Sequence, residues 1–245
     1  MMINSILGGQ RLEMKKGRKP LAWWIMMTAA VILFVFGCQN LKLLKEYKMR
    51  FSSGDYQWLA TQAVDCDSAN DTCGQLHLIK GDACFRLAKA ETDQAINYAC
   101  AAAELEKGIM LNKKWDDKAK KLQTHENLCE SLRNLQDLQS GPEAEETLEK
   151  LAAASNHLSA LFPGTYAAVY FSAKTVLRKA QSVLWNNKPM EKIKACQSLA
   201  GALKAVKNAT LKGRADGGSA WKRYESNYAF LTANLARTIR QLGCQ

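Results

Sequence analysis

The sequence has little proline, glycine or aromatic residue content, and it lacks the alternating apolar and polar pattern of a half-buried strand. Four prolines and fifteen glycines occur in 245 residues, and 8% of the residues are aromatic. Valine-, isoleucine- and threonine-rich runs bounded by Asn-Gly or Asp-Gly turns are also missing. These absences exclude a collagen-like or low-complexity chain and disfavour a β-sheet protein. A hydrophobic fraction of 47% excludes a disordered chain and suffices for one domain, or two small ones.

The sequence also lacks the motifs of common enzymes, metal sites and cofactor sites. It contains no G-x-S-x-G elbow, phosphate-binding loop, dinucleotide-binding glycine motif or H-E-x-x-H motif. There is no C-x-x-C-H haem motif and no C-x-x-C pair. The histidines His77, His125 and His157 lie far apart along the chain. We therefore predict a protein that is not an enzyme, with no catalytic residue, metal or cofactor. Basic stripes interleaved with aromatic residues are absent too, which excludes nucleic acid as a predicted partner.

The first 37 residues have the layout of a secretory signal. Five basic residues between 11 and 19 are opposed by one acid, and an apolar block follows over residues 21–36. A basic segment, an apolar core and then small residues are typical of a signal peptide. The sixteen apolar residues are fewer than the roughly 20 that a membrane-spanning helix needs. Met14 is a suitable start, so we expect residues 1–13 to be an extension of the gene model.

The end of this segment, Val35-Phe36-Gly37-Cys38, resembles the lipobox of bacterial lipoproteins. The resemblance implies that cleavage falls between Gly37 and Cys38, that Cys38 becomes the lipidated first residue, and that two or three acyl chains such as palmitate hold the protein on a membrane. In a Gram-negative cell, Gln39 in place of aspartate implies the outer membrane, facing the periplasm. Two alternatives remain open: an uncut apolar anchor with its basic flank inside, and an ordinary cysteine at position 38. With either kind of anchor, residues 39–245 lie outside the cytoplasm.

The rest of the chain predicts an all-helical domain. Alanine, leucine, lysine and glutamate dominate, and apolar residues recur at helical spacing. We expect a tether over residues 38–54 and an all-α domain over 55–245. The stripe on the last segment, from Trp221 to Leu242, is a predicted core face. The predicted helices cover residues 40–52, 55–65, 74–90, 93–111, 115–139, 143–161, 165–185, 189–208 and 219–242.

Short connections between these segments predict antiparallel helical hairpins. The pair 74–90 and 93–111 contains Gly81-Asp82-Ala83-Cys84 in its first helix, and Tyr98 and three alanines over 101–103 in its second. This pattern resembles a tetratricopeptide repeat, in which a small residue marks a tight helix crossing. The resemblance covers about 40 residues. It implies a tetratricopeptide-like array of hairpins with a concave binding face, and an irregular helical bundle is the alternative.

Four cysteines form two candidate disulfides, because an exported protein lies in an oxidising compartment. Cys66 and Cys73 flank a short polar loop that a local bridge can close. Cys84 and Cys100 each lie about eight residues from the turn between their helices, which is roughly 12 Å along each helix. Equal heights on facing helices allow a bridge. Zinc binding by Cys66, Cys73 and His77 is a weaker alternative to the first disulfide.

The three remaining cysteines, Cys129, Cys196 and Cys244, have no predicted pairing. Cys196 lies about 18 Å before the predicted end of its helix, and Cys244 lies about 37 Å beyond the start of the next one. A simple hairpin would therefore keep these two sulfurs apart unless the last helix were shifted or bent. Cys129 shares a helical face with Trp115 and Leu122, which predicts a buried thiol.

These features favour a lipid-anchored scaffold that binds another protein or peptide in the cell envelope. The alternative is a ligand-binding accessory lipoprotein of a solute transport system, with an apolar pocket lined by Tyr166, Tyr170 or Trp185. A third hypothesis is a structural protein of the envelope. Removing residues 1–37 reduces the net charge from +11 to +7, which allows only a weak attraction to anionic surfaces.

Overall fold

A computed structural model describes residues 40–66, 70–186 and 189–244. It divides the chain into residues 1–42 and residues 43–245, and the second unit is described below. In the described ranges all regular secondary structure is helical, which confirms the predicted fold class. The signal segment, Gly37, Cys38 and Gln39 lie outside these ranges. In the described part of the chain, no helix combines the length and apolarity needed to cross a membrane.

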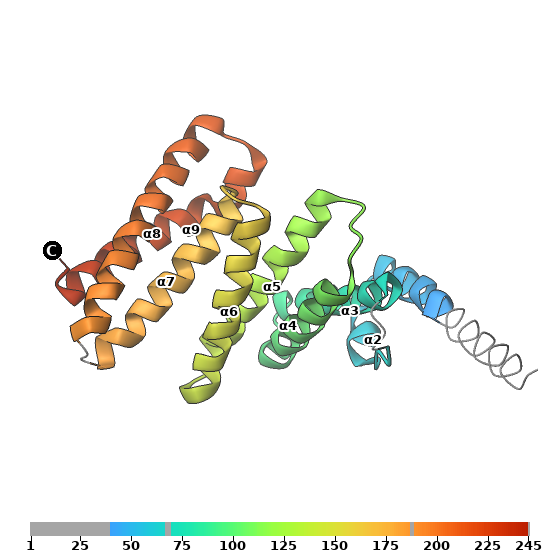
Figure 1. Cartoon of the computed structure of the whole chain (residues 1–245). Coiled ribbons are helices and arrows are strands. Elements are labelled where there is room, and N and C mark those ends of the chain that lie inside the picture. The colour runs from blue at the N-terminus through green and yellow to red at the C-terminus, as the bar shows by residue number, and fades with distance from the viewer. Residues whose placement is uncertain (1–39, 67–69, 187–188, 245) are drawn as a thin grey trace, which may run out of the picture. The chain divides into compact units, whose positions relative to one another are not determined.

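The helices follow the predicted order, and most of their bounds lie within four residues of the prediction. A helix that ends at Ser52 comes first, and a short α2 follows it. The largest differences are at α2, which is shorter than expected, and at α8, which is eight residues longer. The labelled helices of Figure 1 are α2 (Tyr56–Thr61), α3 (Asp71–Lys89), α4 (Gln94–Leu111), α5 (Lys118–Leu138), α6 (Gly141–Leu161), α7 (Tyr166–Asn186), α8 (Pro189–Asp216) and α9 (Ser219–Leu242).

Consecutive helices pack against each other as a stack of hairpins. Helix α3 packs against α4, α5 against α6, and α7 against α8, while contacts of α4 with α5 and of α6 with α7 join the hairpins. Helix α9 packs against both α7 and α8. The chain therefore forms a helical bundle built mostly from neighbours in sequence.

The α3–α4 crossing is close because each helix presents a glycine to a leucine of the other. A Cβ atom at Gly81 would lie 2.7 Å from Cγ of Leu105, and one at Gly108 would lie 2.6 Å from Cδ2 of Leu78. Carbon atoms in normal contact are about 3.5–4.0 Å apart, so neither position has room for a side chain. The small residue that the sequence places at Gly81 thus marks a tight helix crossing, as predicted.

The largest hydrophobic core contains the predicted stripe of α9. Tyr228 and Leu235 are fully buried, and Trp221 lies 5.4 Å from Tyr228 between ring centroids. The Tyr228 hydroxyl donates a 2.8 Å hydrogen bond to the backbone oxygen of Tyr166. Complete burial of each such side chain contributes roughly 1.5–3 kcal/mol. Ile239, the one partly exposed member of the stripe, packs at the edge of this core.

The two predicted local cysteine pairs are joined in the structure. The Cα atoms of Cys66 and Cys73 are 5.7 Å apart, and those of Cys84 and Cys100 are 5.9 Å apart. Both distances fall in the usual range for a disulfide. Cys129 carries a free thiol and is completely buried, and this burial raises the pKa of the thiol. It is therefore an unreactive core residue.

The expected separation of Cys196 and Cys244 is wrong, because α8 is longer than its sequence suggests. The two cysteines form a disulfide, with Cα atoms 5.5 Å apart. Helix α8 continues to Asp216, so Cys196 lies about 30 Å from the turn instead of about 18 Å. Gly213 begins a glycine-rich stretch over residues 213–218, which in the sequence is typical of a break between helices. In the structure it is a contact point, where an added Cβ would overlap the indole ring of Trp221.

Candidate functional site

Helices α3, α5, α7 and α9 border two adjacent hollows on the protein surface. A third hollow lies farther along α5, α7 and α9. The first has a volume of about 810 Å³ and is bordered mainly by α3 and α5. The second measures about 190 Å³ and is bordered mainly by α5, α7 and α9. Lys89 and Asn127 line both, so these two are adjacent. The third measures about 480 Å³ and is bordered by α5, α6, α7 and α9. We call this series of hollows the trough.

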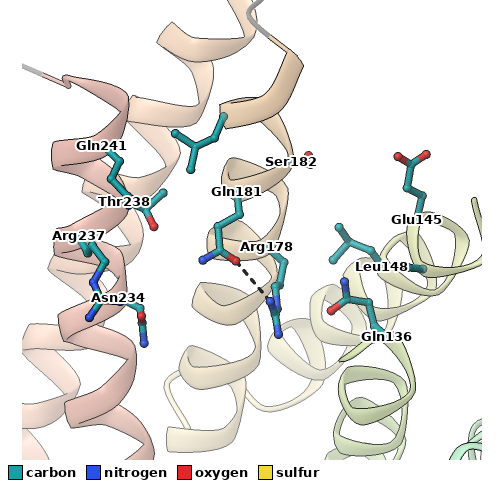
Figure 2. A pocket seen from close by; sticks show the side chains of 12 residues that line it. Gln136, Glu145, Leu148, Arg178, Gln181, Ser182, Asn234, Arg237, Thr238 and Gln241 are labelled. Atoms are coloured by element: carbon teal, nitrogen blue, oxygen red, sulfur yellow. Dashed lines mark hydrogen bonds between the residues drawn. The ribbon is translucent and has the colours of Figure 1, made fainter. Parts of the chain in front are cut away.

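Figure 2 shows the polar lining of the third hollow. Arg178 and Gln181 project from α7, and Arg178 donates a 3.5 Å hydrogen bond to Oε1 of Gln181. Asn234 and Arg237 lie across from them on α9, and Leu148 contributes apolar surface from α6. Within the described residues, Arg237 has no ion-pair partner. This hollow is therefore open and polar, with hydrogen-bond donors on two facing helices.

Ion pairs connect the helices that border the trough. Glu126 on α5 is 6% exposed, and its burial raises the pKa of the carboxyl group while Arg223 opposes that rise. Asp137, also on α5, forms ion pairs with two arginines, Arg133 and Arg178. These pairs hold α5 against α3, α7 and α9. The pairs between helices are Lys89–Glu130 at 3.1 Å, Arg223–Glu126 at 2.5 Å, and Arg178–Asp137. Arg133 pairs with Asp137 within α5, at 3.4 Å.

One lysine of α7, Lys174, is buried and has no ion-pair partner among the described residues. It is 8% exposed and lies on α7, one helical turn after Tyr170 and one before Arg178. Burial lowers the pKa of its ammonium group, and the charge of Arg133 lowers it further. Its side chain lines neither the second nor the third hollow.

His77 belongs to a separate buried cluster near the Cys66–Cys73 disulfide. Its Nδ1 lies 2.5 Å from Oε2 of Glu104, and Lys80 donates to the other oxygen of Glu104 at 2.7 Å. Although burial acts in the opposite direction, these hydrogen bonds lower the pKa of Glu104. The alternative in which His77 binds zinc with the two cysteines is wrong, because the disulfide takes up both sulfurs. In the described ranges, no group of three His, Cys, Asp or Glu residues is placed to hold a metal.

His125 and His157, which are distant in sequence, lie side by side, His125 buried in the core and His157 exposed at its edge. Their ring centroids are 5.0 Å apart, and His125 also packs against Trp115 and Phe162. His125 is 2% exposed, and its Nε2 has no hydrogen-bond partner. Burial is the main reason why its pKa is lowered to about 4. The neutral imidazole of His125 is therefore part of the hydrophobic packing.

The buried imidazole predicts a loss of stability in mild acid. An unfolded chain protonates His125 near its ordinary pKa of about 6.5, whereas the folded chain resists protonation down to about 4. The stabilisation is complete above about pH 6.5 and decreases as the pH falls toward 4. Between pH 7.5 and pH 5 we expect the free energy of unfolding to decrease by about 2 kcal/mol through this group. Urea unfolding at both pH values measures the decrease.

The matched variant for this prediction is His125→Leu, which keeps an apolar side chain at the position. Its free energy of unfolding should depend less steeply on pH than that of the wild type over the same interval. Equal pH dependence in the two proteins would show that another group is responsible.

Sequence reasoning identified two disulfides, Cys66–Cys73 and Cys84–Cys100, but neither the Cys196–Cys244 disulfide nor the trough. The charged residues of α5 that border the trough recur at helical spacing and resemble an ordinary solvated face. They include Glu126, Glu130 and Arg133. Of the residues expected to line an apolar pocket, Tyr166 packs against Trp221, and Tyr170 lines the small charged hollow. The side chain of Trp185 lies outside the described part of the structure.

Comparisons with known proteins leave the function to be argued from these residues. No protein-family model matches the chain, and no curated protein or solved structure matches it either.

Proposed function

We propose that this protein is a non-catalytic, lipid-anchored scaffold of the cell envelope that binds a segment of another protein in the trough. The observation that carries this proposal is that the trough is bordered by α3, α5, α7 and α9, which belong to successive hairpins. In tetratricopeptide-like arrays, alternate helices likewise line one binding face. A partner lying along these helices would contact several hairpins at once.

The lining of the trough suits a polar protein segment. It combines both signs of charge with amide side chains such as Asn127, Asn227 and Asn234. Asn227 is exposed at the second hollow. Polar, accessible groups at an interface contribute mainly specificity and association rate, through complementary charge. We therefore expect a partner with both acidic and basic residues.

The disulfides support the envelope location. Three bonds join Cys66 to Cys73, Cys84 to Cys100, and Cys196 to Cys244. Stable disulfides are rare in the reducing cytoplasm and common in exported proteins. They are consistent with cleavage after Gly37 and lipidation of Cys38.

A fractionation experiment tests the anchor. The Cys38→Ser variant should neither mature nor receive lipid, because serine lacks the sulfur that carries the diacylglycerol. In a Gram-negative host, Gln39→Asp should still mature but move to the inner membrane. Intact mass and membrane fractionation measure both effects. If Cys38→Ser is processed and fractionates as the wild type does, the lipoprotein assignment is wrong.

Site-specific photocrosslinking in cells tests the binding face. A photoreactive amino acid at Asn227 lies in the trough, whereas one at Met110, which is 70% exposed on α4, is the control. We expect one reproducible crosslinked protein at native expression from Asn227 and none from Met110. Crosslinks of equal yield from both positions, or from neither, would contradict binding in the trough.

A second candidate function, an accessory ligand-binding lipoprotein of a transport system, is supported by one different hollow. It lies between α8 and α9, measures about 650 Å³, and is lined partly by Leu211 and Trp221. Such a hollow suits a small apolar ligand. Native mass spectrometry of the protein extracted from membranes would reveal a co-purifying molecule. A lysine in place of Leu211 should then abolish its retention.

A further inference from the structure

The positive charge of the chain after residue 37 is concentrated on its last two helices. Residues 189–242 contain ten basic and three acidic residues, whereas residues 38–188 contain nineteen of each. The net charge of +7 therefore belongs to α8, α9 and the turn between them, at the C-terminal end of the stack (Figure 1). Bases gathered on two neighbouring helices attract an anionic surface more strongly than the same charge spread over the whole molecule.

One side of α8 carries an exposed stripe that contains bases and apolar residues but no acid. Helix α8 packs against α7 and α9, and its Leu199 and Val206 are buried in the core. The stripe runs along another side of the helix, where residues at three- and four-residue spacing are all exposed. Its members are Ile193, Gln197, Ala200, Lys204, Lys207, Leu211 and Arg214.

The bases of this stripe continue onto α9 across the hollow of about 650 Å³ between the two helices. Lys207, Leu211 and Arg214 border that hollow from α8, and Lys222 borders it from α9. In the described part of the chain, none of these three bases lies within ion-pair distance of a carboxylate. Since Glu225 is the one acid that lines the hollow, three positive charges face one negative charge there.

We propose that the α8 stripe and Lys222 together form a docking face for the anionic surface of a lipid bilayer. The bases would lie among the phosphate groups of the lipids, and Leu211, which is 68% exposed, would enter the boundary between headgroups and acyl chains. Helices that lie on membranes combine basic and apolar side chains in the same way. The inference rests on the membrane location proposed above, and it adds a second contact between the chain and that membrane.

The spacing of the apolar residues favours a bilayer over an acidic protein as the occupant. Ile193 and Leu211 are both exposed, but they are 18 residues apart along α8, which is about 27 Å. A protein interface normally has a contiguous apolar centre, which two isolated side chains do not provide. Single side chains can each enter a flat bilayer surface. An N-terminal anchor also keeps the docking face at a high effective concentration near that surface, so that a weak attraction suffices.

Fluorescence quenching by lipid tests the docking face in the full-length protein, reconstituted in vesicles. One set of vesicles contains phosphatidylcholine alone, and the other contains equal amounts of phosphatidylcholine and phosphatidylglycerol, with bromine on the acyl chains in both. A fluorescent amino acid replaces Leu211, or Leu138 on α5 as a control, which is 51% exposed. We expect quenching at position 211 in the anionic vesicles but not in the neutral ones, and none at position 138 in either.

Neutralising three bases of the docking face should remove this contact. A base near an anionic surface contributes about five-fold to binding. The triple variant Lys207→Gln, Arg214→Gln, Lys222→Gln should therefore lower the ratio of docked to undocked protein by about 100-fold, and quenching at position 211 should be lost. In about 1 M salt, where the Debye length is about 3 Å, the wild type should lose quenching as well.

The matched control removes the same charge from the part of the chain that has no net charge. Lys113, Lys114 and Lys118 are exposed before and at the start of α5. Replacing all three by glutamine should leave quenching at position 211 unchanged. Circular dichroism should show equal helical content in the two triple variants, because all six bases are exposed.

Several results would overturn the docking face. They are equal quenching at position 211 in the two kinds of vesicle, quenching in neither, and an equal loss in the two triple variants. A photoreactive amino acid at position 211 that crosslinks to a protein in cells, without quenching by lipid, would show that the occupant is a protein. Fractionation of Cys38→Ser reports on the anchor alone, whereas quenching at position 211 reports on α8, so failure of one proposal is distinguishable from failure of the other.

Discussion

Replacing Cys196 and Cys244 together by serine is expected to lower the free energy of unfolding by about 4 kcal/mol. Their disulfide joins residues 48 positions apart and therefore restricts the unfolded chain more than the other two bridges. The same loop-entropy relation gives about 3 kcal/mol for the 16-residue separation of Cys84 and Cys100. It gives about 2.5 kcal/mol for the 7-residue separation of Cys66 and Cys73.

The measurement is urea unfolding of the three paired serine variants under oxidising conditions. Their order of stability loss should follow the sequence separation. With a reductant present, the four proteins should unfold at more similar urea concentrations, because all three bridges are then open in each. If the Cys66/Cys73 variant loses more stability than the Cys196/Cys244 variant, chain entropy does not set the order, and the local packing of α3 must be dominant.

A single methyl group at Gly108 is expected to cost about 2–3 kcal/mol of unfolding free energy. The added Cβ would lie 2.6 Å from Cδ2 and 2.9 Å from the backbone nitrogen of Leu78. The leucine side chain can rotate, but the backbone contact requires the two helices to separate. Urea unfolding of Gly108→Ala measures the cost.

The matched control is Gly201→Ala on α8, where nothing lies within 4 Å of the added Cβ. This change should increase the free energy of unfolding by about 0.5–1 kcal/mol, because alanine favours the helix more than glycine does. The two identical substitutions therefore have opposite expected signs. A stabilised Gly108→Ala would show that α3 and α4 are farther apart than described.

Local sequence patterns were sufficient for the secondary structure and for the short-range bridges. The core stripe of α9 follows from helical periodicity alone, because each of its members lies three or four residues from the next. The Cys84–Cys100 bridge follows from equal distances to one turn, since a helix rises a fixed 1.5 Å per residue. These inferences need only the geometry of one helix or of one hairpin.

Contacts between distant segments could not be inferred in this way. Helix α8 continues through Gly213, a residue type that normally weakens a helix. There the indole ring of Trp221 from α9 packs so closely that it leaves no room for a side chain. The pairing of Cys196 with Cys244 followed from that longer helix. The contact between His125 and His157 likewise depends on how α5 and α6 pack.

The trough illustrates most clearly the difference between what local sequence patterns determine and what contacts between distant segments decide. By itself the sequence determined that the chain is helical, that its helices pair as hairpins, and which faces are apolar, because these properties repeat with the period of one helix. Only the tertiary structure decided that Arg178 of α7 reaches the carboxylate of Asp137 on α5, which Arg133 of the same helix also contacts. Charged residues on a helix have the same spacing whether they face water or each other, and only the packing of α5 against its neighbours distinguishes the two.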